Sequence, residues 1–339
     1  MIRYKCTVAY DGSAYCGWQT QKNGNSVQEQ IEAALQHITG ESIRILAAGR
    51  TDAGVNAWGQ VFQFDMEQDM TERKLMGAIN GFLPPDIHIR RVEKKDSLFH
   101  ARYCVRSKRY DYNINFGEYD VFSRNHAYQC PYRVDIERMK QGARYLVGTH
   151  DFTSFNSNSL KETPDQVRTI ESIDFTEAGD RLTISYRGRG FLRYMVRMMT
   201  AQLLDVGRGK LEPEDIRRIL EARSKTIARR NAHPEGLTLM EISYFEVLAE
   251  TGRLTVREVL PEDEAALAGI RTSYVLADRH TNEVYGIYEA AEAGGILTCW
   301  KDCGEELDCI VEGLKTYENR TQSGRTVQLC LRQKGSGTE

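Results

Sequence analysis

The chain has 339 residues, a length that favours two or three domains over a single core. With 41% hydrophobic and 27% charged residues, its composition is that of an ordinary globular protein, and no apolar run approaches the roughly 18 residues that a membrane span requires. Eight cysteines at irregular spacings argue against a disulfide framework. We therefore expect reduced thiols, a cytoplasmic location and no export signal before the strand pattern that starts at Ile2.

The net charge of −3 is an average over unlike parts of the chain. Residues 250–339 hold 10 Lys+Arg and 16 Asp+Glu, a net charge of −6. The remaining 35 Lys+Arg and 32 Asp+Glu give residues 1–249 a net charge of +3. Residues 181–230 alone hold 13 Lys+Arg and 5 Asp+Glu, a net charge of +8. Such a cluster attracts a phosphate backbone, but a solvated helix face has the same signature, so charge alone leaves both open. Aromatic residues inside this cluster favour RNA.

Hydrophobic periodicity predicts the elements of the first half. Ser26 is the expected N-cap of the first helix, Gly40 its end, and Pro84-Pro85 the stop after the second. We expect strands at 2–10, 43–48, 61–65 and 87–92, and helices at 26–38 and 71–81. Strands and helices in this mixed order predict an antiparallel or mixed sheet with helices on one face.

The second half repeats this content. We expect strands at 107–114, 167–175, 181–187 and 240–247, and helices at 135–146, 192–207 and 214–222. A smaller α+β appendage follows, with strands expected at 254–256, 271–277, 283–290 and 327–331 and a helix at 305–317. The predicted domains are 1–104, 105–249 and 250–339, of which the last has no assigned role.

One loop is built to present a charged side chain. The stretch 48–57 reads Ala-Gly-Arg-Thr-Asp-Ala-Gly-Val-Asn-Ala, so that Arg50 and Asp52 stand between two glycines that permit tight backbone. A glycine-rich turn in which Asp52 only bonds a nearby N–H is the alternative. The motif is longer than a turn needs, and Asp52 is the first candidate for a catalytic residue.

The residues 49–55, Gly-Arg-Thr-Asp-Ala-Gly-Val, resemble the signature of the tRNA pseudouridine synthase A family. Further matches follow in order and at similar spacing, at 10–19, 26–28, 99–102, 108–112, 151–155, 195–197 and 235–237. The resemblance covers residues 1 to about 247. It departs at Asn56, where the family commonly has histidine.

The resemblance implies a pseudouridine synthase fold, in which two ferredoxin-like halves share a mainly antiparallel sheet, usually as a homodimer. It implies an isomerase that makes pseudouridine at positions 38–40 in the anticodon stem-loop of tRNA. Asp52 is then the essential carboxylate, as nucleophile at C1′ or C6 or as base at C2′. Arg197 pairs with Asp52 and is expected to lower its pKa by about one to three units. Tyr110 stacks on the uracil, Leu237 packs below it, and Arg50 contacts RNA or fills the space of the extruded base.

Breaking and remaking a bond at C1′ requires no metal, redox group or other cofactor, and we expect none. A zinc site at Cys299, Cys303 and Cys309 is a weak alternative because no histidine follows at ligand spacing. His100 and His150 are expected to be structural or to contact the RNA backbone. The alternative functions are a glycosidase, which needs a second carboxylate, a catalytically idle RNA-binding or chaperone protein, and a synthase acting on another RNA.

Overall fold

The computed structural model describes residues 1–22, 24–245, 247–250, 254–260, 263–267, 270, 272–279, 281–289, 296–299, 306–307, 310–311, 313–314 and 330–333. The chain divides into two compact units. The first comprises Met1–Lys94 and Ser107–Ser243, and the second Lys95–Arg106 and Tyr244–Glu339. In the described part of the chain, every helix is too short or too polar to traverse a bilayer.

The first half of unit 1 has three long strands, one two-residue strand and two helices. Its elements are β1 (Ile2–Tyr10), α1 (Val27–Thr39), β2 (Leu46–Ala47), β3 (Asn56–Met66), α2 (Glu72–Phe82) and β4 (Ile87–Lys95). Ser26 caps α1 by accepting from Glu29 N, and Gly40 ends it with a φ of 75°, as the sequence predicted. The apolar residues of α1 recur at helical spacing, and Val27, Ile31, Ala34 and Leu35 are buried.

The second half of unit 1 adds seven longer elements and two short strands. They are β5 (Val105–Asn115), β6 (Tyr128–Gln129), α3 (Ile136–Ala143), β7 (Gly148–Asp151), β8 (Val167–Ala178), β9 (Arg181–Gly188), α4 (Met195–Gly207), α5 (Pro213–Glu221) and β10 (Leu237–Tyr244). Eleven of the 13 residues of α4 are buried, and the two exceptions, Arg197 and Asp205, each carry an ion pair. A helix that is apolar on nearly every side belongs in the core.

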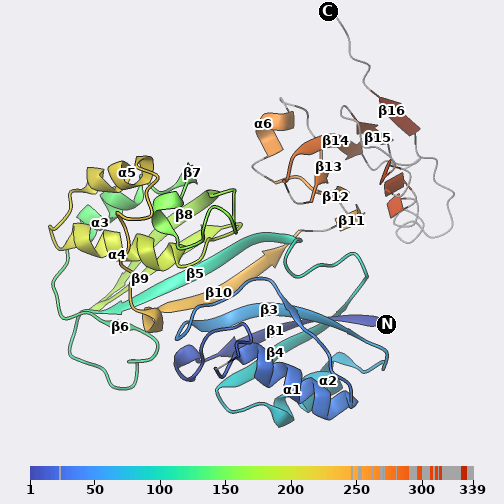
Figure 1. Cartoon of the computed structure of the whole chain (residues 1–339), viewed down its shortest axis with the longest axis horizontal. Coiled ribbons are helices and arrows are strands. Elements are labelled where there is room, and N and C mark those ends of the chain that lie inside the picture. The colour runs from blue at the N-terminus through green and yellow to red at the C-terminus, as the bar shows by residue number, and fades with distance from the viewer. Residues whose placement is uncertain are drawn as a thin grey trace, which may run out of the picture. The chain divides into compact units, whose positions relative to one another are not determined.

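The strands form one sheet of ten in the order β4-β1-β3-β10-β5-β9-β8-β7, with β2 beside β3 and β6 beside β5. Figure 1 shows α1 and α2 together at the β1–β3–β4 end and α3, α4 and α5 at the β8–β9 end. The sheet is mainly antiparallel, with parallel pairs at β3–β10 and β5–β6. This confirms the predicted mixed α+β fold. The late strand β10 lies between the two halves, where it pairs Thr238 with Asn56 of β3.

Unit 2 combines a segment from the middle of the chain with the C-terminal part. Its sheet has the order β11-β12-β13-β14-β15-β16, in which β11 (Val247–Glu250), β12 (Leu254–Glu258), β13 (Tyr274–Asp278), β14 (Val284–Glu289), β15 (Ile296–Cys299) and β16 (Cys330–Gln333) take part. A short helix, α6, spans Glu264–Leu267. Phe99 packs on Tyr244 with ring centroids 5.0 Å apart, and Cys104 shares a buried cluster with Leu260.

Most element boundaries agree with the sequence pattern to within a few residues. The strand expected at 43–48 is reduced to β2, and the strand expected at 61–65 begins earlier, at Asn56. The helix expected from residue 192 begins at Met195, because Tyr194 adopts a left-handed φ of 63° that ends the preceding turn. The strand expected at 240–247 is divided into β10 and β11. The described residues between 305 and 317 are helical, whereas 327–329 of the last expected strand, and both Cys303 and Cys309, lie outside the described residues.

Candidate active site

The loop that carries Asp52 rests on the opening motif of the chain. Trp18 N donates to Thr51 O at 3.1 Å, Gly54 N donates to Tyr15 O at 3.3 Å, and the hydroxyls of Tyr10 and Thr51 share a hydrogen bond of 2.8 Å. A Cβ at Gly17, whose φ is 106°, would come within 2.7 Å of Thr51 O. The close approach of the two segments therefore depends on glycine.

The start of the same loop is fixed by two side chains. Gln60 of β3 donates to Gly49 O at 3.0 Å, and Lys108 of β5 donates to Ala48 O at 2.9 Å. Lys108 comes from the second half of the sheet, so both halves hold the loop. Asp52 is thus presented by backbone that is anchored at both ends.

Asn56 ties three more segments to the end of the loop. The side chain is buried, its Oδ1 accepts from Gly12 N at 2.8 Å, and its Nδ2 donates to Asn125 O at 2.7 Å and to Glu235 O at 3.2 Å. An amide supplies one acceptor and two donors at once, whereas a neutral imidazole supplies one of each. Sequence reasoning noted Asn56 only as a departure from the family pattern and missed this role.

Asp52 forms an ion pair with Arg197. Arg197 Nη1 lies 3.3 Å from Asp52 Oδ2, and the two side chains are 12% and 20% exposed. Arg197 Nε donates to Ala232 O at 2.9 Å, and Ala232 N donates back to Arg197 O at 3.0 Å. Because Arg197 is in the first turn of a buried helix and is held from both sides, the guanidinium has a fixed position opposite the carboxylate.

The expected lowering of the pKa of Asp52 is wrong. Burial raises the pKa of this carboxyl above its ordinary value, while the charges of Arg197 and Arg193 act in the opposite direction without cancelling the effect. The pairing uses a single guanidinium nitrogen rather than a two-pronged contact, so desolvation outweighs attraction. The pair instead limits how far burial raises the pKa. Sequence reasoning missed Arg193, two residues before α4.

Tyr110 is 8% exposed on β5 and meets Phe191 edge to face, with ring centroids 5.2 Å apart. Burial raises its pKa, and the charges of Tyr10 and Asp52 raise it further. The phenol therefore stays protonated at neutral pH. This supplies a neutral, ordered aromatic surface in the neighbourhood of the carboxylate.

The remaining two candidates have different settings. Leu237 is 5% exposed at the start of β10, directly after the turn Pro234–Gly236. A Cβ at Gly54, whose φ is 76°, would lie 3.0 Å from Pro234 Cγ, so this turn packs on the Asp52 loop. Arg50 is exposed on the same loop, two residues from Asp52. The structure thus joins Asp52 to Arg197 directly, and places the segments of the other candidates around them.

The two-half sheet and this loop place the chain among the pseudouridine synthases. A family model described as tRNA pseudouridine synthase matches residues 7–104 and 143–245. The chain belongs to the tRNA pseudouridine synthase family.

Curated relatives carry the same description. The chain is 46% identical over 246 residues to tRNA pseudouridine synthase A 1 of Bacillus cereus, which covers 72% of this chain and 99% of the relative. It is 44% identical over 248 residues to tRNA pseudouridine synthase A of Oceanobacillus iheyensis, an alignment that covers 73% of this chain and 98% of the relative. It is 42% identical over 247 residues to tRNA pseudouridine synthase A of an Exiguobacterium species, covering 73% of this chain and 100% of the relative. The family model ends at residue 245, so it does not reach the C-terminal part of unit 2.

Proposed function

We propose that the chain isomerises uridine to pseudouridine at positions 38–40 in the anticodon stem-loop of tRNA, with Asp52 as the essential carboxylate. The observation that carries the proposal is the pair of Asp52 and Arg197, held by a loop that both halves of the sheet anchor. The reaction needs one ionised acid at the target nucleotide, whether that acid attacks C1′ of the ribose, attacks C6 of the uracil or removes the C2′ proton. It consumes no oxidant, reductant or phosphate energy.

The other candidates receive roles that agree with their settings. Tyr110 holds the uracil ring while the glycosidic bond is broken and the base turns, and Leu237 closes the apolar side of the same space. Arg50, exposed on the loop, contacts the RNA where the target base leaves the stack. Arg197 keeps the carboxylate ionised against the effect of burial. Basic residues in 181–230, with a net charge of +8, attract the RNA backbone.

We further propose that the protein acts as a homodimer in the cytoplasm, and that residues 250–339 form an extra α+β domain. Family membership supports the dimer. Light scattering after gel filtration of the full chain measures it directly, and a mass of one chain would contradict it.

The test of the reaction is tritium release from tRNA that contains 5-³H-uridine. We expect release by the unmodified protein and none by Asp52→Ala or Asp52→Asn, while a filter assay shows that both variants still bind tRNA. Release by either variant would remove Asp52 from the mechanism. Binding without release by the unmodified protein would instead establish an idle RNA-binding protein.

A further inference from the structure

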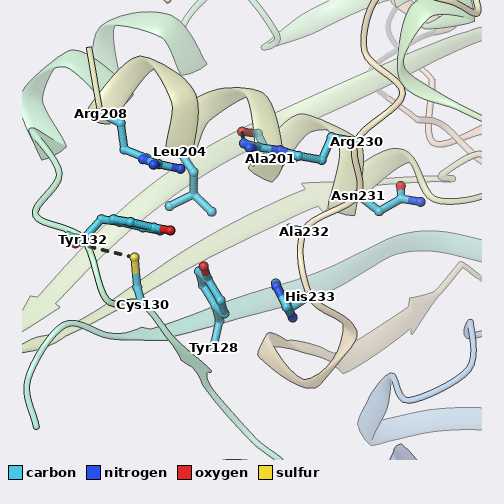
Figure 2. Close-up of a pocket in the computed structure, with 10 residues that line it drawn as sticks. All are labelled: Tyr128, Cys130, Tyr132, Ala201, Leu204, Arg208, Arg230, Asn231, Ala232 and His233. Carbon is cyan, nitrogen blue, oxygen red and sulfur yellow. Dashed lines mark hydrogen bonds between the residues drawn. The ribbon is translucent and has the colours of Figure 1, made fainter. Parts of the chain in front are cut away.

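A pocket lies near the Asp52 site, between α4, β6 and the segment 230–233 (Figure 2). Its volume is about 100 Å³, several times the roughly 10–15 Å³ that one water occupies, so it accommodates a planar ring rather than a single water. All of its lining residues belong to unit 1. The bond-breaking and bond-forming steps proposed above use none of their side chains.

Two flat stacks contribute to the lining. The Arg208 guanidinium lies over the Tyr132 ring at 3.8 Å, and the Tyr128 ring stacks on His233 with centroids 4.7 Å apart and planes 12° apart. Figure 2 shows Arg208 and Tyr132 in one part of the pocket, with Leu204 beside Arg208, and Tyr128 and His233 together in another. Planar rings and guanidinium groups are the surfaces on which proteins stack nucleobases.

The charges around the pocket favour a neutral ring over a phosphate. Arg208 is the C-cap of α4, so the pocket lies at the negative end of that helix dipole. Arg230, the second lining guanidinium, is already paired with Asp205 at 2.6 Å and donates to Ala201 O at 2.9 Å. Ala201, Leu204 and Ala232 add apolar surface, which suits the faces of a base better than an anion.

The segment that lines this pocket also positions the ion pair. Ala232, a lining residue, makes the two backbone contacts that fix Arg197. The next residue, His233, lines the pocket and accepts at its carbonyl from the Tyr112 hydroxyl at 3.0 Å. A ring bound against this segment would therefore lie one residue from the support of the Asp52–Arg197 pair.

We propose that the pocket binds a second nucleobase of the tRNA, unstacked from the RNA and different from the uridine that reacts at Asp52. The bound base packs against residues 230–233 and so reinforces the support that holds Arg197 opposite the carboxylate. The proposal rests on the function proposed above, because it assumes that tRNA is the bound RNA.

The main test uses Tyr132→Ala in the full chain, with Tyr132→Phe as the matched control. Tyr132 is 46% exposed, so the ring can be removed with little loss of core. Loss of a stacking surface typically weakens binding about tenfold per base. We expect Tyr132→Ala to raise the KM for tRNA about tenfold with a smaller change in kcat. Tyr132→Phe keeps the ring, so its KM should stay within about twofold of that of the unmodified protein.

An abasic scan identifies the bound base. Each nucleotide around the target is replaced in turn by an abasic site, and the Kd is measured with the unmodified protein and with Tyr132→Ala. We expect one position at which an abasic site weakens binding to the unmodified protein about tenfold but leaves binding to Tyr132→Ala unchanged. The two changes remove the same stacking contact, so their effects are not additive. Arg208→Gln removes the other member of the Arg208–Tyr132 stack, so the abasic site at the same position should no longer weaken binding to this variant.

Two outcomes overturn the proposal. One is a scan in which every abasic site has the same effect on the unmodified protein and on both variants. The other is that inorganic phosphate, but not a nucleoside, competes with tRNA for binding, and that Arg208→Gln abolishes this competition. The pocket would then be a phosphate site. Because Kd is measured without turnover, an inactive protein that still passes the scan would contradict the proposed reaction and support the pocket.

Discussion

Asn56→Ala is the substitution whose effect the structure defines most closely. It leaves the buried Gly12 N without its acceptor and deprives the partly buried Asn125 O and Glu235 O of a donor. A net hydrogen bond contributes about 1 kcal/mol, and an unsatisfied buried group costs 1–3 kcal/mol. We therefore expect the free energy of unfolding to fall by about 3 kcal/mol.

Calorimetry or urea unfolding measures this loss. Unit 1 has 94 plus 137 residues, or 231, and a unit of that size loses roughly 2–4 °C in Tm per kcal/mol, so we expect a decrease of about 6–12 °C. Tritium release should fall at least tenfold at a temperature where the variant is folded, because the Asp52 loop loses three attachments. Asn56→His should be intermediate, since an imidazole restores at most two of the three bonds.

Asn125→Ala is the matched control. It removes an exposed side-chain bond to Ser13 Oγ at 3.3 Å but keeps the carbonyl that Asn56 reaches. We expect its Tm to change by less than about 2 °C. If Asn56→Ala also melts within 2 °C of the unmodified protein, the three bonds do not stabilise the loop and the reasoning is refuted.

Further predictions concern charge and glycine. Arg197→Gln removes the strongest influence that lowers the pKa of Asp52, so the acid limb of kcat/KM should move to higher pH; an unchanged limb in the pH profile would contradict this. A carboxyl whose pKa is raised on folding stabilises the protein below its unfolded pKa and loses that stabilisation as pH rises through the folded pKa. Burial raises the pKa of Asp52, so the uncharged variant Asp52→Asn should have a Tm about 1–3 °C higher than the unmodified protein at pH 7. A lower Tm would contradict this. Gly12→Ala puts a Cβ 2.1 Å from Val55 O and should cost more than about 2 kcal/mol in urea unfolding. Gly77→Ala, in open space inside α2, should instead add about 0.5–1 kcal/mol, and a loss there would refute the argument from space.

The sequence predicted best what depends on neighbouring residues. Ser26 and Gly40 signal the ends of α1 locally, and alternation marks β1, β8 and β9. Two-residue strands such as β6 are too short to leave a pattern. The insertion of β10 beside β3 depends on a pairing across the whole unit, for which no local signal exists.

The candidate site shows the same limit. Asp52 and Arg197 are 145 positions apart, and only the resemblance to a family indicated that they are paired. The sign of the pKa shift was wrong because a sequence reveals the charged partner but not the degree of burial that competes with it. The bonds of Asn56 were missed because their partners are backbone groups, which carry no sequence signature.

The position of β10 has a consequence for biosynthesis. A nascent chain that has left the ribosome only as far as residue 236 contains Asp52, Tyr110 and Arg197, but lacks the strand that lies between β3 and β5. Those two strands then present open edges that invite pairing with other chains, a recognised route to aggregation. Synthesis of β10, Leu237–Tyr244, thus separates an aggregation-prone intermediate from a complete ten-stranded sheet, and chaperones that shield strand edges have their greatest effect just before it.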